Sequence, residues 1–110
     1  MAINSRTKGK TGELELAAYL RGYGFDSARG QQFKGGGDSP DVTGLPGFHI
    51  EVKRVEAGNL YKWLDQAIRD AKVENMPVVI HRKNKKGWVA ILQLEDFLQM
   101  VEDAHRADHK

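Results

Sequence analysis

The sequence predicts an α/β fold: a mixed β-sheet flanked by helices in the order αβββαββα. Three observations lead to this prediction. Apolar residues recur at helical spacing near the start, the middle and the end of the chain. Short apolar or alternating stretches between them are typical of strands, and turns containing glycine and proline separate these stretches. The 110 residues contain no repeat and no linker, so we expect one domain, over residues 1–110.

A glycine marks the end of the first expected helix. We expect a flexible basic arm over residues 1–7 and a helix over residues 8–23, which ends at Gly24 because glycine is favoured just after a helix. A short strand over residues 25–29 and a glycine-rich loop over residues 30–40 follow.

The rest of the chain begins with a hairpin. Residues 41–43 and 48–54 are expected to pair, because the turn sequence Gly44-Leu45-Pro46-Gly47 lies between them. The further elements are a helix, two strands joined by a turn, a helix and a flexible tail: residues 60–74, 78–82, 88–92, 94–104 and 105–110.

Composition excludes several protein classes. The chain is 40% hydrophobic and 29% charged, which is ordinary for a globular protein. No apolar run approaches the roughly 20 residues that a membrane helix needs, and residues 1–10 lack the apolar core of a signal peptide. The absence of cysteine excludes disulfides and thiolate metal sites, and it fits a cytoplasmic protein that is not bound to a membrane.

The net charge of +2 is unevenly distributed. Residues 1–94 hold fifteen Lys and Arg against ten Asp and Glu, whereas residues 95–110 hold two against five. The basic main body makes nucleic acid a candidate partner. Ordinary charge scatter on a solvated surface is the alternative.

The main functional motif is Pro40-Asp41, followed ten positions later by Glu51-Val52-Lys53. Side chains alternate along a strand, so Glu51 and Lys53 share one face while Val52 points to the other. A hard cation such as Mg²⁺ prefers oxygen ligands, commonly carboxylates together with substrate phosphate. A neighbouring lysine can stabilise charge on the phosphate or on the attacking water. The motif therefore predicts phosphodiester hydrolysis.

Glu13 interrupts the apolar stripe of the first expected helix, to which Leu16 and Leu20 belong. A carboxylate that faces the interior is costly unless it is paired or bound to a metal. One interpretation is that Glu13 reaches the site of Asp41 and Glu51. The other is that it stays solvated in the first turns, where acids suit the helix dipole.

The second expected helix carries a polar row beside its apolar face, formed by Lys62, Gln66 and Arg69. An amide can orient a water or contact a phosphate or a base. The alternative is an exposed helix face.

A loop, a turn and one histidine each have two interpretations. Residues 29–37, with their glycines and cations, suit a segment that closes over DNA, or they form only a mobile connection. Residues 82–86 could contact phosphates nonspecifically or form a solvated hairpin tip. His49 shares the Glu51 face, where it lies near the site or packs as an ordinary histidine.

These motifs belong to a longer string of segments: residues 8–16, 24–25, 29–32, 40–42, 44–47, 50–54, 66–67 and 77–79. The string resembles the PD-(D/E)XK nuclease superfamily, which has a restriction-endonuclease-like core. Within it, the chain is similar to the small Holliday junction resolvase-like nucleases of phages and prophages. The resemblance covers nearly the whole chain.

The resemblance implies a metal-dependent endonuclease. Asp41 and Glu51 would ligate Mg²⁺ or Mn²⁺, with the Val52 carbonyl as a further ligand. Glu13 would complete the acidic site, directly or through water.

Two further residues have roles by resemblance. Lys53 would position or activate the attacking water, and Gln66 matches a glutamine that some members carry on the helix after the lysine. The basic residues expected to contact DNA are Lys8, Lys10, Arg29, Lys34, Arg54, Lys62 and Arg69.

Branched DNA, most simply a Holliday junction, is the expected substrate. Resolution requires two incisions, so a symmetric homodimer is expected, in the cytoplasm of a bacterium or a phage-infected cell. A virus-type replication-repair or flap nuclease and a DNA-binding module that does not cut are the alternatives.

Overall fold

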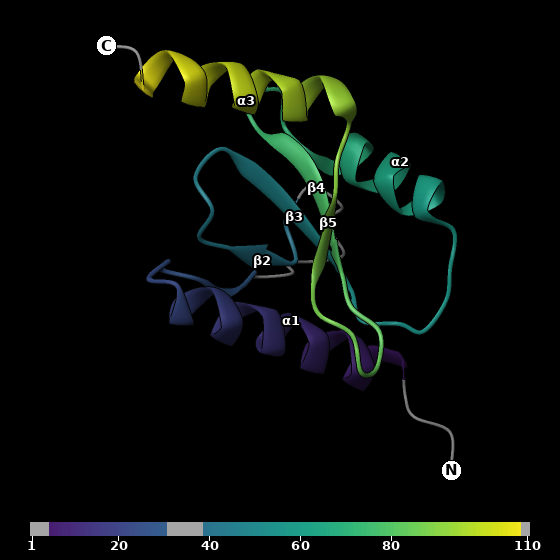
Figure 1. Cartoon of the computed structure of the whole chain (residues 1–110). Coiled ribbons are helices and arrows are strands. Elements are labelled where there is room, and N and C mark those ends of the chain that lie inside the picture. The colour runs from purple at the N-terminus through teal and green to yellow at the C-terminus, as the bar shows by residue number, and fades with distance from the viewer. Residues whose placement is uncertain (1–4, 31–38, 109–110) are drawn as a thin grey trace.

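The described residues form one five-stranded sheet with three helices packed around it or at its end (Figure 1). The computed structural model describes residues 5–30 and 39–108, with side chains from residue 9 onward in these ranges. The elements in chain order are α1 (Ser5–Gly22), β1 (Ala28–Arg29), β2 (Val42–Thr43), β3 (Phe48–Lys53), α2 (Leu60–Asp70), β4 (Met76–His81), β5 (Val89–Ile91) and α3 (Leu94–Asp108). This confirms the predicted order αβββαββα.

The sheet is mixed, as predicted, with strand order β1-β2-β3-β4-β5. Neighbouring strands are antiparallel except β3 and β4, which run parallel with Glu51 beside Val79 and Lys53 beside His81. Parallel neighbours need a long connection, which α2 provides. As a result, α2 returns along the sheet in the direction opposite to β3.

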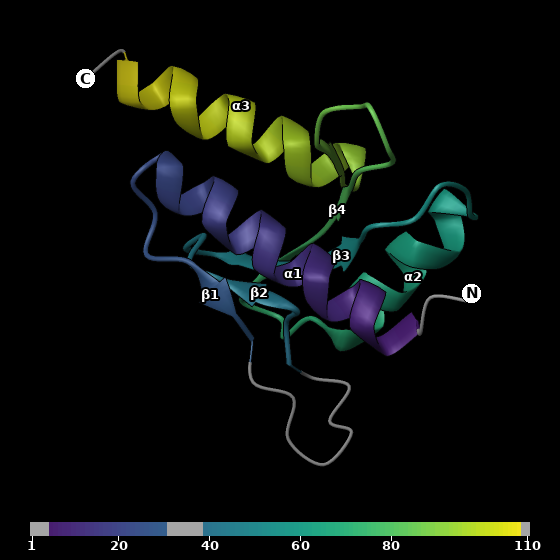
Figure 2. The same cartoon turned by 90° about the horizontal axis from the view of Figure 1, so that it is seen from below.

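The two faces of the sheet carry different side chains. Ile50 and Val78 lie side by side on β3 and β4 and are buried with Leu16 of α1. Figure 2 shows α1 lying across the strands on this face. Alternation turns Glu51 and Lys53 to the opposite face, where α2 packs. The predicted motif is therefore enclosed between the sheet and α2.

α1 ends in the predicted glycine cap. Gly24 has a φ of 95°, in the left-handed region that glycine adopts without strain. Its N–H donates to the Arg21 carbonyl at 2.9 Å, and the Phe25 N–H donates to the Leu20 carbonyl at 3.2 Å. This pair of bonds is the Schellman pattern, and it turns the chain back toward β1.

A second glycine holds the start of the predicted β2–β3 hairpin, in which Val42 pairs with Ile50. The Gly30 N–H donates to the Asp41 carbonyl at 2.8 Å. A Cβ on Gly30 would lie 1.9 Å from the Pro40 carbonyl oxygen, so a side chain here would push the two segments apart. Gly30 therefore sets where Asp41 enters the sheet.

Several predicted boundaries differ from the structure. α1 begins at Ser5, so part of the expected arm is helical, and α3 continues to Asp108 through the first residues of the expected tail. β1 is shorter than expected and begins at Ala28. α2 ends at Asp70, before residue 74, because the chain must turn to bring the Met76 N–H to the Gly47 carbonyl, at 2.8 Å.

β4 begins two residues before the predicted start and contains Pro77. Proline cannot donate a ladder hydrogen bond and is tolerated where a strand has a free side. Pro77 pairs with His49 of β3, but β5 reaches β4 only from Val79 onward, so the proline costs no bond on that side. Among the described residues, no helix is long and apolar enough to cross a membrane.

Replacing Gly30 by alanine should destabilise the protein, because the added Cβ meets the Pro40 carbonyl oxygen. We expect a loss of about 1–3 kcal/mol in the free energy of unfolding. Gly22→Ala is the matched control, because a Cβ there meets no atom within 4 Å and alanine favours the helix. Thermal and denaturant unfolding measure both; equal stability of the two variants would contradict the close approach at Gly30.

Candidate active site

Two carboxylates, Asp41 and Glu51, meet where β2 pairs with β3. The Asp41 N–H donates to the Ile50 carbonyl at 2.8 Å, and the Val52 N–H donates to Asp41 Oδ2 at 2.8 Å. A hydrogen bond also joins the side chains of Asp41 and Glu51. The structure thus brings the two predicted ligand residues together. Val52 offers only its backbone, because its side chain packs on the α1 face.

Glu51 is almost fully buried, with 4% of its surface exposed. Burial, the charge of Asp41, their shared hydrogen bond and the charge of Asp70 raise the pKa of Glu51 to about 9, while Lys53 opposes this increase. At neutral pH, Glu51 of the metal-free chain therefore holds a proton. Without a cation, the site lacks the positive charge that would stabilise its carboxylates in ionised form.

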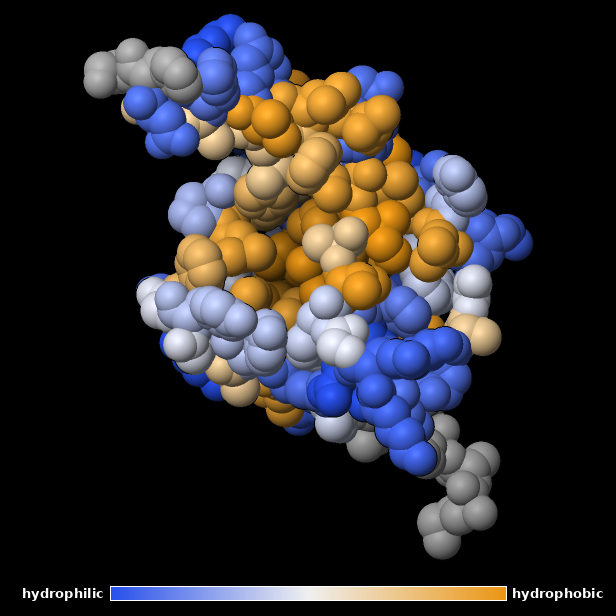
Figure 3. All heavy atoms as spheres, in the orientation of Figure 1, coloured by the Kyte–Doolittle hydropathy of each residue, from blue (hydrophilic) through white to orange (hydrophobic). Residues whose placement is uncertain are grey.

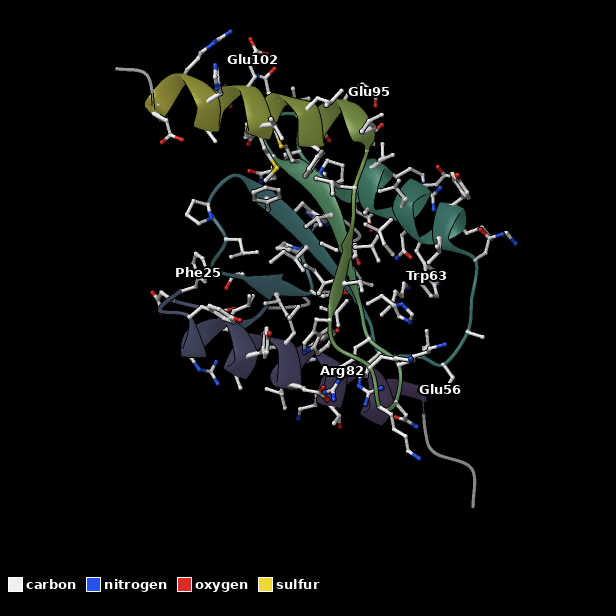
Figure 4. The ribbon with its side chains drawn as sticks, in the orientation of Figure 1. Phe25, Glu56, Trp63, Arg82, Glu95 and Glu102 are labelled. Atoms are coloured by element: carbon white, nitrogen blue, oxygen red, sulfur yellow. The ribbon has the colours of Figure 1, made fainter. Side chains whose placement is uncertain are left out.

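α2 brings Gln66 to the predicted lysine. Lys53 Nζ donates to Gln66 Oε1 at 3.4 Å. Trp63 fixes the helix on the sheet, with its ring centroid 4.9 Å from that of His81 (Figure 4). His81 Nε2 is in turn 2.9 Å from the Val55 carbonyl oxygen. Two of the predicted residues on separate elements, Lys53 and Gln66, therefore form one contact.

His49 and Asp70 extend the site, and Asp70 is not among the site residues that the sequence predicts. His49 Nε2 lies 2.9 Å from Glu51 Oε1, and both side chains are buried. His49, Glu51 and Asp70 each offer a ligand atom, and these atoms lie within 4.8 Å of one another. The sequence did contain a sign that Asp70 could join the site, because it follows Gln66 by four residues and so lies on the same helix face.

Glu13 projects from α1 and is mostly buried, with 13% of its side chain exposed. Arg29 Nε lies 2.5 Å from Glu13 Oε1. Burial raises the pKa of Glu13, the hydrogen bond from Arg29 lowers it, and the negative charge of Asp41 adds to the increase. Glu13 thus lies near enough to Asp41 to interact with it electrostatically, but its carboxylate is paired with Arg29.

The basic residues predicted to contact DNA have different surroundings. Lys10, Lys62 and Arg69 are exposed. Lys34 and the side chain of Lys8 lie outside the described part of the structure.

Arg54 is engaged within the chain, with only 16% of its side chain exposed. Its guanidinium donates to Glu15 at 3.4 Å, to the Arg82 carbonyl at 3.4 Å and to Asn84 at 3.1 Å, and it lies 3.7 Å from Glu56. The contacts join α1 to the β4–β5 turn. Arg54 therefore has a structural role that the sequence did not indicate.

The donor set fits a hard divalent cation. Glu51 and Asp70 offer carboxylate oxygens that lie within 4.8 Å of each other and of a ring nitrogen of His49, and the Asp41 carboxyl lies beside Glu51. Such ligands suit Mg²⁺ and Mn²⁺. A bound cation would supply the missing positive charge and allow Glu51 to ionise.

A protein-family model described as phage putative PDDEXK endonuclease matches residues 4–109 of the chain. No curated protein and no solved structure matches the chain. The family match spans every described element, including the whole sheet and the three helices.

The buried carboxyl predicts an unusual pH dependence of stability. The pKa of Glu51 is raised from 4.5 to about 9 by folding, so the unfolded chain binds fewer protons between these values. The free energy of unfolding of the metal-free protein should therefore fall as pH rises through this window. Thermal unfolding in a chelator from pH 5 to pH 9 measures it.

Glu51→Gln should flatten this fall, because the amide mimics the protonated acid. We expect Mg²⁺ to stabilise the parent protein at high pH and the variant to lose this stabilisation. Glu74→Gln, on an exposed glutamate, is the control and should keep both behaviours. An unchanged slope in Glu51→Gln would show that Glu51 ionises normally.

Proposed function

The chain belongs to the family described as phage putative PDDEXK endonuclease, and we propose that it is a divalent-metal-dependent endonuclease of branched DNA, with the Holliday junction as its preferred substrate. The observation that carries the proposal is the contact of Asp41 and Glu51 on the face of β3 that also carries Lys53, two residues further along the strand. Two carboxylates for a metal and an ammonium for a phosphate form a hydrolytic site.

Each residue of the site has a distinct proposed task. Asp41 and Glu51, with the Val52 carbonyl, would hold Mg²⁺ or Mn²⁺, which supplies Lewis-acid stabilisation of charge on the phosphate. Glu13 would support the metal directly or through water. Its pairing with Arg29 favours the indirect route, because one of its oxygens already accepts a hydrogen bond.

Lys53 would act on the reacting phosphate. Its ammonium can stabilise the developing negative charge and orient the attacking water. The 3.4 Å contact with Gln66 Oε1 keeps the ammonium near the sheet face, so we assign Gln66 as a positioning residue. His49 has a comparable task for Glu51, whose Oε1 it contacts at 2.9 Å.

DNA would approach along α2. Lys62 and Arg69 are exposed on the helix that carries Gln66, and Lys10 is exposed on α1. Arg29 would take part through the charge that it places beside Glu13, and Lys8 and Lys34 complete the proposed set. Arg54 is kept as a weaker candidate, because its guanidinium is already engaged by Glu15 and Asn84.

A homodimer is part of the proposal. A junction is resolved by two incisions, and one chain holds one site, so two copies would place two sites on the DNA. The setting would be DNA recombination in the cytoplasm of a bacterium or a phage-infected cell. A flap or virus-type replication-repair nuclease is the alternative within the family, and a DNA-binding module that does not cut is the alternative outside catalysis.

Substrate choice can be tested by comparing cleavage of a four-way junction, a 5′ flap and a plain duplex of the same sequence, each with Mg²⁺. We expect paired symmetric nicks on the junction and little cleavage of the other two substrates. Preferred cleavage of the flap would replace the proposal by the flap nuclease. No cleavage of any branched DNA with Mg²⁺ or Mn²⁺ would favour the binding module.

Site substitutions test the chemistry separately from substrate choice. Asp41→Asn and Lys53→Ala should each lower junction cleavage by about 100-fold or more, because each removes a charge needed at the phosphate. Junction binding, measured by gel shift in Ca²⁺, should be retained. Asp65→Asn, an exposed position on α2, is the matched control and should cleave normally. Full activity of Asp41→Asn would disprove the site.

A further inference from the structure

α3 carries an apolar stripe that its own chain leaves exposed. Leu94, Phe97, Leu98 and Val101 follow helical spacing and keep 63%, 48%, 53% and 51% of their surface exposed. These four residues are called the α3 stripe. All fifteen residues of α3 are described, and none of them is buried. Figure 3 shows apolar surface over α3 that continues onto the strands between α3 and α1.

Such a surface is unfavourable for a single copy in water. A helix of this length is only marginally stable unless its apolar face is covered. Together with the exposed Met100 and Val89, the stripe presents on the order of 500 Å² of apolar surface, the upper range for a monomer. Two copies would bury on the order of 1,000 Å², about the minimum for a specific interface.

The charges around the stripe exclude nucleic acid as its occupant. α3 carries five carboxylates and a single arginine, and Figure 4 shows Glu95 and Glu102 on its outer side. Phosphates would be repelled by these carboxylates. An apolar surface bordered by acids is suited to a protein partner.

We propose that a second copy of this chain covers the α3 stripe, with the two α3 helices antiparallel about a two-fold axis. The four residues of the stripe are centred between Phe97 and Leu98, so an axis at this point lays the stripe of each copy on the stripe of the other. Glu95 and Glu102 stay on the outer side of the helix, and Arg106 is paired with Glu102 of its own helix, so the contact rests on the apolar area. Leu98 lies beside the axis.

This interface would form the homodimer of the proposed function. The inference rests on the proposed function only for the need for two copies. α3 is separate from the site residues on β2, β3 and α2. Asp41→Asn should therefore lose cleavage while keeping the dimer mass, so that failure of the nuclease proposal and failure of the interface give different results.

The first test is the mass in solution of the full chain, by light scattering or sedimentation equilibrium. The parent protein should have twice the 12.3 kDa mass of one chain, and Leu98→Lys should have the mass of one chain. Gln99→Lys is the matched control: it adds the same charge one position along, on the opposite side of α3, where Gln99 contacts Asp103 at 3.0 Å. It should remain dimeric. A monomeric parent or a dimeric, folded Leu98→Lys overturns the proposal.

A single-cysteine variant tests the arrangement even if Leu98→Lys does not fold. The chain contains no cysteine, so Leu98→Cys has one thiol per copy. At the two-fold axis, a mild thiol oxidant should convert it to a disulfide-linked dimer at least tenfold faster than Gln99→Cys. Equal rates for the two variants would overturn the antiparallel pairing, and circular dichroism confirms that each variant is folded.

Discussion

Asp41 and Glu51 are held in contact where β2 pairs with β3, and the charge that they share affects both the stability and the proposed chemistry of the protein. Two carboxyl groups are held together at a place where one of them is almost completely buried. Like charges cannot both ionise there without a compensating cation. In the metal-free chain, Glu51 carries a proton and is neutral. A bound cation would instead balance the negative charge of the ionised carboxylates. Burial thus links stability, metal affinity and the proposed chemistry.

The fold supplies this contact through backbone geometry. Gly30 lets the chain approach Pro40 closely enough to fix the entry of Asp41, and the Val52 N–H then holds the Asp41 carboxylate. The parallel pairing of β3 with β4 forces α2 to run back across the motif, which brings Gln66 to Lys53. Each of these contacts joins segments that are distant in the sequence.

Charged residues outside the site also help to hold α1 against the rest of the fold. Glu15 accepts hydrogen bonds from Arg54 and Arg82, and Asn84 accepts another from Arg54. This network ties α1 to the end of β3 and to the β4–β5 turn. Partly buried ion pairs of this kind mainly specify arrangement, because desolvation offsets much of their attraction. A basic residue in this family fold is therefore not by itself evidence of a DNA contact.

The order of helices and strands, the cap at Gly24 and the shared face of Glu51 and Lys53 could be predicted from the sequence, because periodicity and turn chemistry are local. The packed fold was needed to show that Asp70 joins the site, that Arg29 pairs with Glu13 and that the apolar stripe of α3 stays uncovered. These outcomes depend on which distant segments pack together. Amphipathic spacing predicts that a helix has an apolar face, but it does not determine what covers that face.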